Sequence, residues 1–470
     1  MGRSCHIRGG RSPRPWRSSF SDMKRKMKPM AWLRQRRWIR YPLRMTIDEQ
    51  DRITRNHADA MYHVGDVAVF EIHLGQGTTD AQLCLSLDGH KVLLHQPLSE
   101  RHVTIRQQLD APGVLRCRVN GMRHNKPFSM LCAAAFDPEQ ITPTTTTPED
   151  FHEFWAAQKT ALAAVPAAPR LEPDPEAPTS HPDCSLQRIR LDHIDNSAVY
   201  GYVAQPTDSS GPLPAVLVLQ NHGGGAWSVP REWVTDLAAL GFLAMAINTH
   251  DVDNGLPAAE YERLNKGPLA SYTLRGFMDR DEYYFRAPYL RVLRALDYLV
   301  DHPRWDGKSL ILTGRSQGGG LSLVGAGLDP RVTGVVCAVP AMCEHGGPRF
   351  GRPAGWPRFV PTDEHDYGGD PNAPTVDGHG PLSDVVWQVS RYYDAVNFAR
   401  RIHCPAVICL GLLDTCVPAM TALSAYNVLA GQRAVVISPD RGHDADRDPH
   451  YRRNERICAI ATTAGSSLRT

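Results

Sequence analysis

A serine between two glycines is the residue best placed for nucleophilic chemistry. The pattern Gly-x-Ser-x-Gly at 314–318 follows an apolar run at 310–313 and precedes a helix-like run at 321–328. Strand, sharp turn and helix are the context in which this pattern forms a nucleophile elbow. Side chains at the two glycine positions would collide with the neighbouring strand and helix, so the pattern predicts that Ser316 is held toward substrate. The amide of Gln317 would then lie at a helix N-terminus and face an oxyanion.

An acid and a histidine follow this serine in the chain. Asp414 comes directly after the predicted strand 406–410, and His443 comes after the predicted strand 434–438. The order nucleophile, acid, histidine, with both partners in loops after strands, is the order of the α/β-hydrolase fold. We therefore expect His443 to take the proton of Ser316, and Asp414 to fix the histidine tautomer and stabilise the imidazolium.

A glycine-rich loop offers a second oxyanion donor. An apolar strand at 217–219 leads into His-Gly-Gly-Gly at 222–225, where missing side chains allow backbone amides to approach a developing charge. Gly224 is the predicted donor, and His222 and Trp227 are candidate substrate-binding residues. A phosphate-binding turn is the competing interpretation, but no Lys-Ser or Lys-Thr follows to complete a P-loop.

The elements needed to position these residues are predicted from residue 186 onward. Short apolar runs alternate with helical patterns there, which indicates a mostly parallel sheet covered by helices on both faces, with an antiparallel edge formed by its opening strands. The predicted strands are 186–194, 199–204, 215–220, 243–247, 309–312, 332–338, 406–410 and 434–437, and the predicted helices are 232–240, 283–300 and 420–429.

A smaller all-β unit is predicted before the hydrolase part. Six runs that alternate apolar and polar residues lie between turn signals within residues 45–141, and Leu-Asp-Gly-His at 87–90 predicts a hairpin turn. This spacing favours a small sandwich of Ig-like form. Carbohydrate binding, an oligomer contact, a lid and simple packing all stay open as its role. Residues 142–185 are predicted to be a linker with a helix at 148–164, and residues 186–470 the catalytic domain.

The first 44 residues carry 14 Lys and Arg against one acid, whereas the remaining 38 basic and 49 acidic residues give a net charge of −11. Without apolar material to fold, this tail is predicted to be disordered, although a nucleic-acid or membrane contact and an upstream extension before Met45 are alternatives. The acidic remainder argues against a nucleic-acid surface. No apolar signal segment follows the charges, so we expect a cytoplasmic protein, with secretion from an alternative start left open.

The other composition signals are weak. No run approaches 18 apolar residues, which argues against a transmembrane helix. The 11 cysteines form no Cys-x-x-Cys pair and lie in apolar runs, which favours buried thiols over a disulfide or zinc framework.

The predicted chemistry needs no metal or organic cofactor. We expect a small-molecule or oligosaccharide ester as substrate, no nucleic-acid or membrane partner, and leave a homo-oligomer open.

Several motifs together resemble one family. The elbow extends to Gly-x-Ser-Gln-Gly-Gly-Gly-Leu, and the resemblance, over roughly 148–450, is to the acetyl xylan esterase and cephalosporin C deacetylase family of carbohydrate esterases. The other matching motifs are Phe-His-Glu-Phe-Trp at 151–155, the segment 275–286, Leu-Asp-Pro-Arg-Val at 328–332, Val-Pro-Ala-Met-Cys at 339–343, the segment 392–399, Ile-His-Cys-Pro at 402–405, Gly-Leu-Leu-Asp at 411–414 and Ala-Tyr-Asn at 425–427.

The sequence also departs from that family's pattern. Arg-Gly-Gln, usual after an early strand, is absent, and this chain has Ala-Ile-Asn-Thr-His-Asp at 246–251 instead. His-Gly-Tyr becomes His-Gly-Gly at 222–224, and His-Glu becomes His-Asp at 443–444. The β unit lies outside the basic pattern. These differences indicate a divergent member of the family. The resemblance therefore implies the acyl group of the substrate more firmly than the alcohol to which that group is attached.

An insertion rich in Gly, Pro and aromatic residues is predicted at 344–392. Near the strand ends, a loop of this size could cover the acyl and alcohol pockets, with Trp356 and Trp387 stacking on sugar faces, or its aromatics could simply hold an irregular loop together.

The leading functional hypothesis is a serine esterase that removes short acyl groups, with acetyl expected, from a carbohydrate or related small alcohol. A prolyl-oligopeptidase-type peptidase is the first alternative, although 90 residues of short strands are too few for the propeller usual in that class. The second is a binding protein that uses the hydrolase fold as a scaffold.

Overall fold

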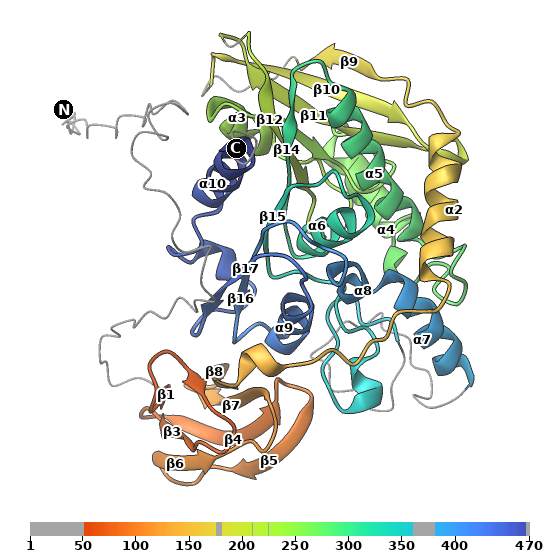
Figure 1. Cartoon of the computed structure of the whole chain (residues 1–470). Coiled ribbons are helices and arrows are strands. Elements are labelled where there is room, and N and C mark those ends of the chain that lie inside the picture. Colours follow the sequence, from red (N-terminus) through yellow and green to blue (C-terminus); the bar gives the residue numbers. More distant parts are fainter. Residues whose placement is uncertain (1–50, 175–180, 209, 224, 361–380, 467–470) are drawn as a thin grey trace, which may run out of the picture.

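The computed structural model describes residues 51–174, 181–208, 210–223, 225–360 and 381–466 (Figure 1). The predicted basic tail, the predicted oxyanion donor Gly224 and part of the predicted insertion lie outside these ranges.

A nine-stranded sheet forms the centre of the larger unit, in the order β17-β16-β15-β14-β12-β13-β11-β10-β9. The strands from β12 to β17 are parallel, and most are short runs buried on both faces, as predicted for a sheet covered by helices. Their bounds are β9 Arg170–Pro173, β10 Cys184–Asp192, β11 Ala198–Pro206, β12 Leu213–Leu219, β13 Leu243–Ile247, β14 Trp305–Arg315, β15 Gly334–Ala338, β16 Ala406–Gly411 and β17 Arg433–Ser438.

Helices cover both faces of this sheet (Figure 1). Successive residues of β12 point alternately into two apolar clusters, so that Val216 packs on the side of α3 and α10, and Leu217 on the side of α5, α6 and α8. The helix bounds are α2 Phe151–Ala163, α3 Glu232–Ala239, α4 Ala258–Lys266, α5 Arg286–Asp301, α6 Gln317–Leu328, α7 Pro381–Tyr393, α8 Ala395–Ala399, α9 Ala419–Asn427 and α10 Arg453–Ser466.

The antiparallel edge is confirmed and extends one strand further than predicted. Strand β11 pairs antiparallel with β13, and β10 with β11, but β9 also joins the edge within the segment predicted as linker. All four residues of β9 are exposed, so it carries none of the alternation by which strands are recognised.

The N-terminal unit consists of two sheets with the strand orders β1-β3-β6 and β2-β8-β7-β4-β5. Phe70 of one sheet and Leu83 and Val119 of the other share one apolar cluster, which confirms the predicted sandwich-like packing. The strands are β1 Arg52–Arg55, β2 Met61–Tyr62, β3 Ala68–His73, β4 Thr78–Leu87, β5 Lys91–Pro97, β6 His102–Gln107, β7 Gly113–Arg123 and β8 Lys126–Phe136.

The N-terminal unit also packs against the larger unit, where β7 contacts helix α9. Along β8, Ala134 belongs to the core of the sandwich, whereas Ala133 and Ala135 join the main cluster of the hydrolase unit. The C-terminal half of this strand is therefore buried on both faces, which explains the consecutive apolar residues at 132–136. In Figure 1 the sandwich lies beside α9 and the ends of β16 and β17.

The prediction of an irregular insertion at 344–392 is wrong for its C-terminal part, which forms α7. Val386, Val389 and Tyr393 are buried at helical spacing, and this periodicity was hidden by the Gly- and Pro-rich residues before it. Helix α4 was also missed, because Tyr261 is its only buried residue.

The ten cysteines among the described residues are free thiols, of which six are buried and four are partly buried. None of the helices described for the chain has both the length and the apolar character needed to cross a bilayer.

Candidate active site

Ser316 occupies a strained turn between β14 and α6. Its backbone has φ 56° and ψ −121°, a combination that costs of the order of 1–3 kcal/mol for a residue with a side chain. A Cβ at Gly314 would lie 2.3 Å from the carbonyl oxygen of Gly318, and one at Gly318 would lie 2.0 Å from that of Leu219. The two glycines of the pattern are therefore required for the reason predicted, since no side chain fits at either position.

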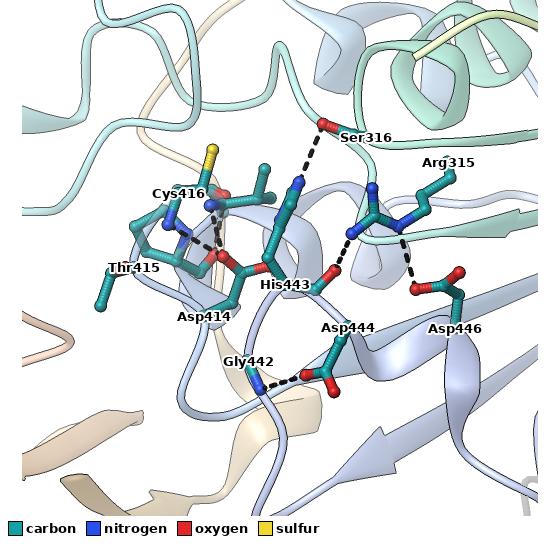
Figure 2. A network of polar contacts seen from close by, with 12 residues as sticks. Arg315, Ser316, Asp414, Thr415, Cys416, Gly442, His443, Asp444 and Asp446 are labelled. Atoms are coloured by element: carbon teal, nitrogen blue, oxygen red, sulfur yellow. Dashed lines mark hydrogen bonds and ion pairs between the residues drawn. The ribbon is translucent and has the colours of Figure 1, made fainter. Parts of the chain in front are cut away.

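The structure brings the three predicted reactive residues into one hydrogen-bonded chain (Figure 2). Nε2 of His443 lies 3.1 Å from Oγ of Ser316, and Nδ1 lies 2.8 Å from Oδ2 of Asp414. In the neutral tautomer that donates from Nδ1 to the carboxylate, Nε2 is left to accept the serine proton. This is the arrangement needed to make a serine hydroxyl nucleophilic.

The carboxylate of Asp414 is fully buried and has acceptor bonds on both oxygens. Oδ1 accepts from the amides of Cys416 and Val417 at 2.9 and 2.8 Å, while Oδ2 faces His443. Two backbone donors fix the orientation of the carboxylate. The loop after β16 thus folds around the acid, which places the carboxylate rather than leaving it to rotate.

Arg315, the variable residue before the serine, holds the histidine loop from the other side. Its Nη2 donates to the carbonyl oxygen of His443, and its Nε donates to Asp446 at 2.9 Å (Figure 2). Sequence reasoning missed this residue, because the elbow pattern leaves its position unspecified. Arg315 links the nucleophile turn and the histidine loop through one side chain.

The predicted oxyanion donors are only partly within the described structure. Gln317 is the first residue of α6, where a helix leaves its amides without intrahelical partners, so its N–H is available to a ligand beside Ser316. Gly223 and Gly225, which flank the predicted donor Gly224, have φ of +56° and +122°. A Cβ at Gly223 would lie 2.3 Å from Nε1 of Trp227, so the indole leaves no room for a side chain there.

A closed ring of hydrogen bonds joins this glycine loop to the elbow. Tyr272 donates to Oε1 of Gln317 at 2.5 Å and faces Nδ1 of His222 at 2.7 Å. Because that hydroxyl proton is used, Nδ1 of His222 must be the donor of the second bond. The side chain of Gln317 continues the ring by donating from Nε2 to Thr249 at 3.1 Å.

The hydroxyl of Thr249 donates to Oε1 of Gln220, and Nε2 of Gln220 donates to the carbonyl oxygen of Trp227 at 2.8 Å. The indole N–H of Trp227 then returns to the carbonyl oxygen of His222 at 3.1 Å. Thr249 stands within the segment 246–251, where the family pattern has Arg-Gly-Gln, so in this chain neutral side chains support the glycine loop. The sequence marked the segment of Thr249 only as a departure from the family pattern, and Tyr272 was not singled out because it belongs to no motif.

The four predicted substrate residues fall into two groups. The ring of Trp356 lies 4.8 Å from that of His222, which places it beside the glycine loop, and Trp227 supports the same loop from within. Trp387 instead lies in α7, where its ring contacts Phe350 and the guanidinium groups of Arg349 and Arg391. A substrate role stays a prediction for all four.

Comparisons with known proteins agree on one family. A model of the acetyl xylan esterase family matches residues 138–352 and 371–458, which is more than half of the chain. The chain is 29% identical over 408 residues to acetyl esterase Axe7A of Xylanibacter ruminicola, covering 84% of this chain and 87% of that protein.

Two solved structures are similar as well. The acetyl xylan esterase from Paenibacillus sp. R4 is 26% identical with a TM-score of 0.55, and covers 65% of this chain and 93% of its own. Acetyl xylan esterase 1 from Thermoanaerobacterium sp. JW/SL YS485, at 22% identity and a TM-score of 0.54, covers 68% of this chain and 97% of its own and supports the fold alone. With its α/β-hydrolase fold and the extent of the family match, this chain belongs to the acetyl xylan esterase family.

Proposed function

We propose that the protein is a serine esterase that removes acetyl groups from a carbohydrate. The observation that carries this proposal is the hydrogen-bonded chain from Asp414 through His443 to Ser316, found in a member of an esterase family. Family membership supports ester hydrolysis, and the geometry supports Ser316 as the nucleophile.

In the first half of the reaction, Oγ of Ser316 forms a bond to the acyl carbon while its proton moves to Nε2 of His443. The negative charge on the carbonyl oxygen is held by the amide of Gln317 and, as we propose, by that of Gly224. The ester C–O bond then breaks, and His443 returns the proton to the leaving alcohol. In the second half, water attacks the acyl group by the same route and frees Ser316.

The substrate class is supported by the relatives. Axe7A is an acetyl esterase, and the solved structure from Paenibacillus sp. R4 is an acetyl xylan esterase. In this chain, the aromatic pair of His222 and Trp356 beside the glycine loop offers faces on which a sugar ring can stack. We therefore propose an acetylated oligosaccharide as the substrate, with acetyl as the preferred acyl group.

Replacing Ser316 by Ala tests the nucleophile. The wild-type protein should hydrolyse p-nitrophenyl acetate and acetylated xylo-oligosaccharides, and Ser316→Ala should lose both activities while its circular dichroism spectrum stays unchanged. Retained hydrolysis by this variant would overturn the assignment of Ser316.

A substrate panel tests the specificity. Turnover should fall as the acyl chain is lengthened from acetyl to hexanoyl, and aminoacyl-proline amides should not be cleaved. Cleavage of those amides without ester hydrolysis would instead assign the site to a peptidase.

A further inference from the structure

The hairpin turn between β4 and β5 inserts into the hydrolase unit behind the catalytic loops. Asp88, in this turn, is 1% exposed, and its Oδ2 accepts from the amide of Met420 at 2.7 Å. Met420 is the second residue of α9, so Asp88 satisfies a donor that the helix itself cannot. The Asp-Gly turn predicted from the sequence thus makes an inter-unit contact.

Arg116 of β7 completes this contact. A single nitrogen, Nη2, donates to Oδ1 of Asp88, to the carbonyl oxygen of Asp414 at 2.8 Å, and to that of Leu412 at 3.4 Å. The guanidinium is 2% exposed. Gly89 leaves space for it, since a Cβ there would lie 2.8 Å from Nη1. The backbone of the predicted catalytic acid is therefore held by a side chain from the N-terminal unit.

The loop of the predicted catalytic histidine has a contact of the same kind. Arg55 of β1 forms an ion pair with Asp440 at 2.7 Å, and the Arg55 side chain is only 6% exposed. Asp440 lies three residues before His443 in the loop after β17. Both loops that carry the partners of Ser316 therefore contact the N-terminal unit.

A contribution to the stability of the fold explains the buried pair of Arg116 and Asp88 poorly. Removing two charges from water is costly, and a well-packed apolar pair is often as stable as a buried ion pair. The pair does, however, fix the loop whose carboxylate must stay 2.8 Å from Nδ1 of His443. A misplacement of about 1 Å in such a group can cost about 100-fold in rate.

We propose that Arg116 is a positioning residue for ester hydrolysis, which acts by holding the Asp414 loop, so that the N-terminal β unit is part of the catalytic apparatus. This inference rests on the proposed function, because it assigns a role in the reaction of the same site. It also gives the N-terminal unit a task other than binding carbohydrate.

The test compares three substitutions on one strand. Arg116→Met removes all three bonds. Arg116→Lys keeps a charged nitrogen with three donors, and its methylene replaces Nε, for which the described residues provide no hydrogen-bond partner. Arg123→Met is the matched control, since Arg123 is also on β7 but pairs with Asp51 inside the N-terminal unit.

The ionisation of Asp88 bears on whether a variant without Arg116 can fold. Burial raises the pKa of its carboxyl to about 6 even with Arg116 present, so without Arg116 the group can take up a proton rather than remain a stranded charge. If Arg116→Met nevertheless fails to fold, the double variant Asp88→Asn/Arg116→Met leaves no charge in the contact and keeps an acceptor for Met420.

We expect Arg116→Met, or the double variant, to lower kcat by about tenfold or more with KM changed less than about twofold, because binding groups are untouched. Arg116→Lys should recover activity to within about threefold of wild type, and Arg123→Met should match wild type. In an Asp414→Asn background, removing Arg116 should change the rate less than about twofold, because its effect passes through the acid.

Three results would overturn the inference: unchanged kcat in a folded variant without Arg116, an equal loss in Arg123→Met, or the same loss in both Asp414 backgrounds. The activity of the wild-type protein separates failure of this inference from failure of the proposed function. A wild-type protein that neither hydrolyses p-nitrophenyl acetate nor reacts with a fluorophosphonate would reject the esterase assignment itself.

Discussion

Each residue of the reactive group is held by a different kind of contact. Ser316 is placed by backbone geometry, through a strained φ that two glycines permit. Asp414 is placed by backbone amides that bond its carboxylate. His443 is placed by neighbouring side chains, because Arg315 bonds its carbonyl oxygen and Asp414 bonds its ring.

Replacing Arg315 by Met should therefore loosen the histidine without altering the nucleophile turn. We expect kcat for p-nitrophenyl acetate to fall about tenfold, with little change in KM, because only the orientation of the general base is disturbed. Steady-state kinetics of purified protein measure this. Arg447→Met, an exposed position on the same loop, is the control and should behave as wild type. Equal activities of the two variants would exclude a role for Arg315.

At the scale of elements, the three predicted reactive residues and the glycine loop all follow strands. The apolar runs of β12, β14, β16 and β17 located the loops of His222, Ser316, Asp414 and His443 correctly, because buried parallel strands have a strong composition signal. The supporting ring through Tyr272, by contrast, could not be predicted. Its members are joined by side chains from separate loops, and no periodicity or motif marks such contacts.

Thr249 offers the most direct test of that ring. Thr249→Val keeps the shape of the side chain but leaves Nε2 of Gln317 without its buried acceptor, which should lower the free energy of unfolding by about 1–3 kcal/mol. Thr249→Ser keeps the hydroxyl and should lose less. Urea unfolding of both variants, with kcat/KM for p-nitrophenyl acetate as a second readout, checks the prediction. Equal stabilities of the two variants would show that the hydroxyl bond is unimportant.

At the scale of the whole molecule, the sequence indicated two units but not how they meet. Runs of alternating apolar and polar residues predicted the sandwich, and the Asp-Gly pair predicted a hairpin turn. The burial of Asp88 and Arg116 could not be inferred, since charged residues in a turn and on a strand are ordinarily solvent-exposed. The contact depends on the placement of one unit against the other, which no local pattern records.

Buried histidines should make the fold sensitive to acid. Burial lowers the pKa of His345, in the loop after β15, to about 3, below its ordinary value of 6.5. The unfolded chain therefore binds a proton between these pH values that the native protein does not, so this histidine destabilises the fold as pH falls below 6.5.

Replacing His345 by Phe removes that proton uptake. Relative to that of wild type, the free energy of unfolding of His345→Phe should increase by about 2 kcal/mol as the pH is lowered from 7 to 5, because only wild type is destabilised by proton uptake. Urea unfolding at both pH values measures the difference, and a control substitution at the exposed His403 should show no such change. A difference independent of pH would contradict the neutral, buried state of His345.

The central claim, that Ser316 forms a covalent acyl intermediate, is tested most directly by locating the site of acylation. Wild-type protein should be mixed with a p-nitrophenyl ester whose acyl group is released slowly, quenched in acid, and mapped by peptide mass spectrometry. The account predicts one added acyl group on the peptide that contains Ser316, and none in Ser316→Ala. Acylation at another residue, or ester turnover with no adduct on wild type under burst conditions, would contradict it.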